Sequence, residues 1–180
     1  MKNVMKLLIL MIGLSFVLSG TAFAQAKFIG VKKCGMCHKA KTGDQLKIWE
    51  ESSHAKAFKT LQTPEADAIA KKAGIEGKAA EADACLSCHV TGHGSTNIDA
   101  SFKVEDGVQC ESCHGAGSEY KSKSIMEDHA KAVAAGMTEY KTEADIEKHC
   151  KTCHNEKSPT FKSFDFAAKW GKIKHPTAKK

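Results

Sequence analysis

Cys34-Gly35-Met36-Cys37-His38 is the first of four segments with the pattern Cys-x-x-Cys-His, which returns at residues 85–89, 110–114 and 150–154. Together the four motifs use all eight cysteines of the chain. The pattern is typical of covalent haem attachment, in which two thiols form thioethers with one porphyrin and the histidine ligates its iron. One Cys-x-x-Cys pair alone would also fit a zinc half-site or a redox dithiol. Four such motifs with no cysteine left over disfavour both alternatives and predict four covalently bound haem c groups.

The motifs assign two kinds of site residue. The predicted haem-attaching cysteines are Cys34, Cys37, Cys85, Cys88, Cys110, Cys113, Cys150 and Cys153. The predicted proximal iron ligands are His38, His89, His114 and His154.

Residues 1–24 have the pattern of a secretory signal peptide. Lysines precede an apolar run from Leu7 to Leu18, and a stretch of small residues ends at Ala24, after which we expect cleavage. The run is shorter than the about 20 apolar residues that a membrane-spanning helix needs. Because covalent haem attachment in bacteria follows export, the leader and the motifs agree. We predict a single tetrahaem domain at residues 25–180, periplasmic or extracellular, with no integral membrane segment after cleavage.

The predicted domain has little apolar side-chain material for a core. Aromatic residues make up only 7% of the chain, whereas lysine is abundant. The porphyrins would supply the missing apolar volume, each tied to the chain by two thioethers and an axial bond. We therefore expect a mainly α fold in which short helices and loops wrap four closely packed haems, with little or no sheet. Without haem the chain should be largely unfolded, as small metalloproteins are without metal.

The charge of the chain has to be corrected for its cofactors. The formal net charge of +6 includes two lysines of the predicted leader, which leaves +4 for the mature polypeptide. Ionised haem propionates would bring the holoprotein to about −4. All 27 basic residues are lysines, and the lack of arginine and of interleaved aromatics argues against nucleic-acid binding. Surface lysines would instead hold propionates or steer an acidic redox partner.

The pattern of apolar residues predicts several short elements. Phe102 and Val104 alternate with polar residues, which suggests one short strand, and the aromatic residues of the tail, among them Phe164 and Trp170, should cover haem faces. The predicted helices span about residues 44–61, 64–73, 81–88, 127–135 and 143–150.

The sixth ligand of each iron decides its chemistry. Methionine is scarce after the leader, and Met36 lies inside the first motif, where it cannot easily reach across its own porphyrin. The spare histidines therefore favour bis-histidine ligation and low reduction potentials. The predicted distal ligands are His54, His129 and His175, and the weaker candidates, each close to a motif in sequence, are His93 and His149. The haem bound by His89 has no evident partner and could stay open.

Three stretches outside or around the motifs are distinctive. They are Trp49-x-x-Ser52-Ser53-His54-Ala55, then Glu105-Asp106-Gly107-Val108-Gln109-Cys110-Glu111-Ser112-Cys113-His114-Gly115-Ala116-Gly117-Ser118, and a C-terminal stretch that contains Cys153-His154-Asn155 and Lys174-His175-Pro176. Together they resemble the cytochrome c-554 family of tetrahaem cytochromes over most of the predicted mature chain. The second stretch is the most specific, with Ala116 where proline is common.

The resemblance implies a mostly helical protein with haems in closely stacked pairs. The distal and proximal pairs that it implies are His54 with His154, His129 with His38, and His175 with His114. In the type member the haem that corresponds to His89 lacks a protein sixth ligand. This chain is shorter than the type member and has a longer interval between His114 and His129, and His93 or His149 could fill the site that the family leaves open.

These observations favour an electron-transfer protein that carries single electrons between periplasmic redox proteins, its donor and its acceptor. One alternative is a small redox enzyme that acts on a nitrogen or sulfur compound at a five-coordinate haem bound by His89. Another is a subunit of an extracellular haem filament, in which a spare histidine ligates a neighbour's iron. We favour the carrier because the sequence shows no cluster of acid and base residues beyond the haem ligands.

Overall fold

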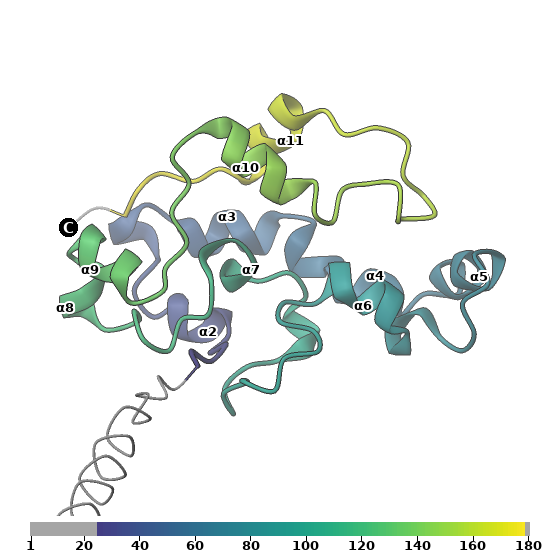
Figure 1. The fold of residues 1–180 in the computed structure, drawn as a ribbon, viewed down its shortest axis with the longest axis horizontal. Helices are drawn as coiled ribbons and strands as arrows, with labels where there is room; N and C mark the ends of the chain where they lie inside the picture. Colours follow the sequence, from purple (N-terminus) through teal and green to yellow (C-terminus); the bar gives the residue numbers. More distant parts are fainter. Residues whose placement is uncertain (1–24, 179–180) are drawn as a thin grey trace, which may run out of the picture.

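A computed structural model describes residues 25–178, and the predicted signal peptide lies outside the described residues (Figure 1). Within residues 25–178 no helix is long and apolar enough to cross a membrane. The α-helices are α2 (Val31–Cys34), α3 (Gln45–Glu51), α4 (Ala57–Leu61), α5 (Pro64–Lys72), α6 (Asp83–His89), α7 (Cys110–His114), α8 (Lys123–Met126), α9 (His129–Ala134), α10 (Glu143–Cys150) and α11 (Phe166–Ile173). The 3₁₀ turns are η1 (Ala40–Thr42), η2 (His54–Lys56), η3 (Ala79–Glu81) and η4 (Val104–Asp106).

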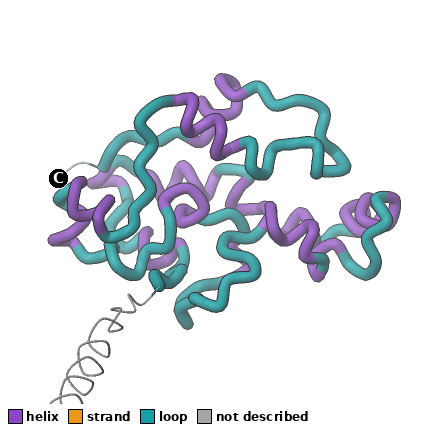
Figure 2. The backbone as a smooth tube through the Cα atoms, in the orientation of Figure 1, coloured by secondary structure: helices purple, strands orange, loops and turns teal. Residues whose placement is uncertain are grey.

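Helices and loops make up the described chain, and Figure 2 draws no strand in it. Helices this short are marginal on their own in water, because nucleation costs more than a few hydrogen bonds return. Several are capped by side chains that accept backbone N–H groups of the first turn: Thr63 for α5, Asp128 for α9, Thr142 for α10 and Asp165 for α11. Caps fix where these helices begin, but packing has to hold them in place.

The sequence places four of these helices correctly. The expected helices at 64–73 and 143–150 are α5 and α10, and those at 81–88 and 127–135 are the shorter α6 and α9. The mainly α fold with little or no sheet is thus confirmed.

The continuous helix expected at 44–61 is wrong, because the structure breaks it into α3, η2 and α4. Ser52 leaves the helical conformation with a ψ of 162°, and its hydroxyl donates to the carbonyl of Trp49 at 2.6 Å. Serine side chains compete in this way with helix continuation. The break turns the following residue pair, Ser53 and His54, out of the helix direction.

The short strand expected around Phe102 and Val104 is also wrong. Val104 opens the 3₁₀ turn η4, and the nearby Ser101 N–H bonds to the Asp99 carboxylate at 2.9 Å, so the segment folds on itself. The bridge between Phe28 and Ile98 is an isolated contact outside any strand.

The apolar core of the described residues is small. The buried apolar residues are Ile29, Val31, Leu61, Ala70, Ala79, Val90, Tyr120 and Ala132. A hydrophobic cluster forms where α4, α5 and η3 meet, around Leu61, Ala70 and Ala79. Since this cluster sits at the α5 end of the molecule (Figure 1), the remaining helices surround little apolar protein material of their own.

A buried polar network takes the place of an apolar centre beside α7. The Glu111 carboxylate is 2% exposed and accepts the backbone N–H groups of Ile29 at 2.9 Å, Gly30 at 2.8 Å and Gly117 at 2.7 Å. Gln109, equally buried, accepts the N–H of Val31 at 2.7 Å. The segment just before the first motif is therefore bonded to α7, the helix that contains the third motif, and to the residue before it.

We predict that Glu111→Ala lowers the free energy of unfolding of the haem-loaded protein by about 3 kcal/mol or more, because it strands several buried N–H donors. Chemical denaturation followed by far-ultraviolet circular dichroism measures the change. Glu105→Ala is the matched control: its exposed side chain should cost less than about 0.5 kcal/mol. Equal midpoints for the two variants would contradict the structural role of Glu111.

Candidate haem-binding sites

Each Cys-x-x-Cys-His motif forms about one helical turn. The N–H of His38 bonds to the carbonyl of Cys34 at 3.1 Å, and that of His154 to Cys150 at 3.0 Å. The second and third motifs lie within α6 and α7. Residues three and four apart share one helix face, so the two thiols and the imidazole of each motif can meet one porphyrin. All eight cysteines are free of disulfides, as thioether formation requires.

Neighbouring cysteines connect the first motif to the third. Hydrogen bonding to the Cys110 thiol, together with burial, raises the pKa of Cys34. The same interaction lowers the pKa of Cys110. The two thiols belong to different motifs, so these two motifs lie in direct contact.

Two further contacts extend this line of motifs. Desolvation by the surrounding chain, and then the charge of Cys150, raise the pKa of Cys113 to about 11. Since Cys113 feels the charge of Cys150, the third motif lies next to the fourth. Burial and then the charge of Cys88 raise the pKa of Cys153. Since Cys153 feels the charge of Cys88, the fourth motif lies next to the second motif. The spatial order of the motifs is therefore first, third, fourth and second, and it differs from their order in sequence.

In two places, the rings of two histidines lie close together. The ring centroids of His54 and His154 lie 6.1 Å apart, and those of His114 and His175 lie 5.8 Å apart. Two imidazoles on opposite sides of one iron, each bonded at about 2 Å, place their centroids about 6 Å apart. The described residues thus bring together two of the three distal and proximal pairs that the sequence implies. Their role as iron ligands stays a prediction.

The position of His54 depends on the segment before the third motif. The indole N–H of Trp49 donates to the carbonyl of Val108 at 2.8 Å, and the N–H of Val108 donates to the carbonyl of His54 at 3.1 Å. Gly107 has a φ of 67°, and a Cβ there would lie 2.8 Å from the His54 carbonyl oxygen. Two of the distinctive sequence stretches therefore bind each other and aim His54 at the fourth motif.

The position of His175 depends on the loop after the first motif. Gln45, at the start of α3, donates its side-chain amide to the carbonyl of Pro176 at 3.1 Å. Gly43 has a φ of 123°, and a Cβ there would lie 2.9 Å from the Pro176 ring. These contacts hold the C-terminal tail where the ring of His175 meets that of His114.

The surroundings lower the pKa of three of the paired imidazoles and so favour their neutral form. Desolvation, followed by the charges of His175, His38 and His149, lowers the pKa of His114 to about 4. Burial also lowers the pKa of His54. Burial, followed by the charge of Lys169, lowers the pKa of His154. A neutral imidazole has the lone pair that binds a metal, so this environment suits ligation.

His89 is oriented by a backbone contact. Its Nδ1 lies 2.9 Å from the carbonyl oxygen of Ala57 in α4. A carbonyl can only accept, so Nδ1 donates and Nε2 has the free lone pair, which is the usual arrangement of a metal-binding histidine.

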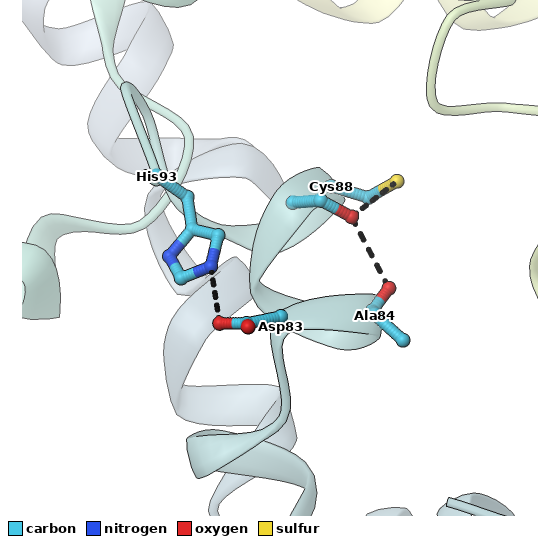
Figure 3. Close-up of polar contacts among 5 residues, drawn as sticks. Asp83, Ala84, Cys88 and His93 are labelled. Atoms are coloured by element: carbon cyan, nitrogen blue, oxygen red, sulfur yellow. Dashed lines mark hydrogen bonds and ion pairs between the residues drawn. The ribbon is translucent and has the colours of Figure 1, made fainter. Parts of the chain in front are cut away.

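The two weaker distal candidates have other partners. His93 Nε2 lies 2.9 Å from the Asp83 carboxylate at the start of α6, as Figure 3 shows. The ring of His149 lies 5.5 Å from that of Tyr140. Neither contact pairs the ring with that of His89.

His129 has a different environment from His54 and His175. Its Nε2 lies 2.9 Å from the Glu139 carboxylate, and its side chain is 67% exposed. The described residues do not show its ring against that of His38. The charge of His175, after burial, instead lowers the pKa of His38. The pairing of His129 with His38 stays a prediction.

Sequence reasoning missed the residues that clamp the third motif. Both tyrosines of the chain donate to its backbone: Tyr120 to the carbonyls of His114 at 3.1 Å and Gly115 at 2.7 Å, and Tyr140 to that of Cys113 at 2.8 Å. The chain contains only these two tyrosines, and this low number was the one feature of the sequence that could have pointed to their role.

The aromatic tail is partly where the sequence suggests. Phe164 stacks on His154 with centroids 4.7 Å apart, and Phe161 joins them around a surface hollow of about 440 Å³. Phe166 stacks on Trp170 within α11 instead. Free thiols in register with neutral histidines, two histidine pairs at the spacing of one metal and an aromatic hollow beside His154 fit covalently bound haem.

We predict that Gly107→Ala destabilises the haem-loaded protein and perturbs the iron beside His154, because the added methyl group would meet the carbonyl of His54. Gly74→Ala is the matched control, with a similarly positive φ but nothing within 4 Å of its Cβ position. Both carry the strain of a positive φ, about 1 kcal/mol. Thermal melts and electron paramagnetic resonance should show an additional loss for Gly107→Ala alone; equal effects would refute the contact with His54.

Comparisons with known proteins agree with this geometry. The family model described as cytochrome c554 and c-prime matches residues 33–115, which include the first three motifs. The chain is similar to cytochrome c-554 of Nitrosomonas europaea, with 33% identity over 143 residues that cover 73% of this chain and 59% of that protein. The chain thus spans about three fifths of the length of this relative. No solved structure matches it. We conclude that the chain belongs to the cytochrome c-554 family and is a c-type cytochrome that binds haem covalently.

Proposed function

We propose that this protein is an exported tetrahaem cytochrome that carries single electrons between redox proteins of the periplasm. The observation that carries the proposal is the unbroken spatial order of its motifs, in which cysteines of one motif adjoin cysteines of the next. Haems bound at adjoining motifs would be close enough to exchange electrons. The leader-like residues 1–24 support export.

The residues of the chain have three tasks in this function. The eight cysteines tie the cofactors to the backbone, and the proximal ligands are His38, His89, His114 and His154. When bound, haem supplies reversible one-electron chemistry, whose potential depends on axial ligands, burial and nearby charge. The distal residues His54 and His175 face two of the proximal histidines and would leave those irons no position for a substrate. His129 is the proposed distal ligand of the haem at His38.

One observation favours a second function. No histidine ring faces His89 in the ring pairs of residues 25–178, while His93 is bonded to Asp83. A haem there with an open position could act on a nitrogen or sulfur compound. In a filament, the same position would receive a histidine from a neighbouring molecule.

Spectroscopy of the four-haem protein distinguishes these functions. A pure carrier should give only low-spin ferric signals in electron paramagnetic resonance, and its reduced form should not bind carbon monoxide. A high-spin signal from one haem, with carbon monoxide binding at one iron per protein, would favour the enzyme. Mass in solution under non-denaturing conditions would reveal a filament.

We predict that His175→Met keeps four covalent haems and raises one midpoint potential by about 0.1 V, because a thioether ligand favours ferrous iron more than imidazole does. A spectroscopic redox titration measures the four potentials. His149→Met is the control, since the ring of His149 packs on Tyr140, and its titration should superimpose on that of the parent. Four unchanged midpoints in His175→Met would rule out ligation by His175.

A further inference from the structure

The line of motifs has two ends, and the two ends differ in charge. The first motif lies at one end and the second at the other, because the third and fourth lie between them. Residues 27–43, around the first motif, contain five lysines and no acidic residue. Residues 65–83, before the second motif, contain five acidic residues and three lysines. Figure 1 shows α2 and α5, which belong to these segments, well apart in the molecule.

Four of these lysines are exposed and flank an exposed apolar residue in the sequence. Met36, in the loop of the first motif, is 70% exposed. We call the four lysines on either side of it in the sequence the lysine rim: Lys32, Lys33, Lys39 and Lys41, all exposed. Within residues 25–178 no member of the rim forms a salt bridge. No protein carboxylate of the described residues therefore neutralises the rim through an ion pair.

The acidic residues nearest to the lysine rim in the described part of the chain form no ion pair with it. Asp99 is the acidic residue whose carboxyl feels Lys33, and the charges of Lys121 and Lys33 help to lower the pKa of this carboxyl after its bonds to Ser101. Asp44 precedes α3. The tail returns to this end through the contact of Pro176 with Gly43 and brings the exposed Lys174 along.

The two acidic residues between α8 and α9 are already paired. Glu127 lies 3.6 Å from Lys123, and Asp128 lies 3.1 Å from Lys131. These pairs add no net charge to the surface beside the first motif. The rim stays the positive end of the line.

We propose that the lysine rim and Met36 form a docking surface for a small acidic one-electron protein, which meets this cytochrome at the haem of the first motif. The proposal rests on the proposed carrier function. A cluster of positive charges steers an acidic partner over a long range, and its effect falls as salt screens it. A single exposed apolar residue within the same segment, Met36, suits a small, short-lived interface of the kind that redox proteins use.

The docking surface can be tested by binding. The four-haem protein is titrated with a flavodoxin, used as a small acidic probe, and isothermal titration calorimetry at low ionic strength gives the dissociation constant. Lys39→Glu with Lys41→Glu reverses two rim charges. Lys71→Glu with Lys72→Glu is the matched control, because it reverses two exposed charges on α5 at the opposite end. Haem absorbance verifies that both variants are loaded and folded.

The rim variant should bind roughly tenfold more weakly than the parent, and the α5 variant less than about twofold, with the difference lost at high salt. Equal weakening in both variants would show an effect of net charge alone and overturn the proposal. Unchanged binding of the rim variant would overturn it as well.

A second measurement, of electron uptake, distinguishes a failure of the proposed docking surface from a failure of the proposed carrier function. The flavodoxin is reduced to its hydroquinone and mixed with the cytochrome, and each transfer should turn one hydroquinone into a semiquinone and one ferric haem into a ferrous haem. Selective binding without electron uptake would overturn the carrier function and leave the docking surface intact. Equal uptake by all variants, with equal binding, would overturn the docking surface and leave the carrier function intact.

Discussion

The bonds that the Glu111 carboxylate accepts tie this molecule together. Glu111 lies between the cysteines of the third motif, and it bonds the backbone of Ile29 and Gly30, just before the first motif, as well as that of Gly117. Three N–H donors and a buried carboxylate satisfy each other, so neither side carries the desolvation cost alone. This bonding explains why motifs that lie far apart in sequence are neighbours in space. The line of motifs is built outward from that contact.

The rest of the architecture follows from a shortage of apolar side chains. The hydrophobic cluster around Leu61 is confined to the region of α4, α5 and η3. Around the third motif, specific hydrogen bonds from Tyr120 and Tyr140 do the work that a core does elsewhere. Directional bonds of this kind fix the motif backbones but fill no volume, which is what a porphyrin would supply. The chain therefore frames its cofactors more than it encloses them.

The sequence predicts those features that depend on neighbouring residues. Thr63 with Pro64 and the capping box of Thr142 with Asp145 mark the starts of α5 and α10, and both helices form where expected. The helix break at Ser52 combines a local bond from the Ser52 hydroxyl to the Trp49 carbonyl with a bond from a distant segment, in which the Val108 N–H donates to the carbonyl of His54. Local apolar spacing contains no information about such a contact.

The same distinction applies to the candidate site. The motifs are local patterns and are readable directly, whereas the partner of each distal histidine depends on the fold. His93 illustrates this: its closeness to the second motif in sequence made it a candidate, yet the carboxylate of Asp83 binds its Nε2. The role of Glu111 was also hidden, because its donors are backbone groups that carry no sequence signature.

His54 and His175 each come from a segment outside the motif that they face, and this makes the sites dependent on one another. His54 precedes the second motif in sequence but faces the fourth, and His175, from the tail, faces the third while its charge reaches His38 of the first. A change in the tail is therefore felt at two adjoining motifs at once, because Gln45 binds Pro176 from the segment that follows the first. The second motif differs, since its proximal histidine is oriented by the backbone of α4 and has no crossing partner among these ring pairs. It is therefore the position at which a relative of this fold can change its chemistry without disturbing the two histidine pairs.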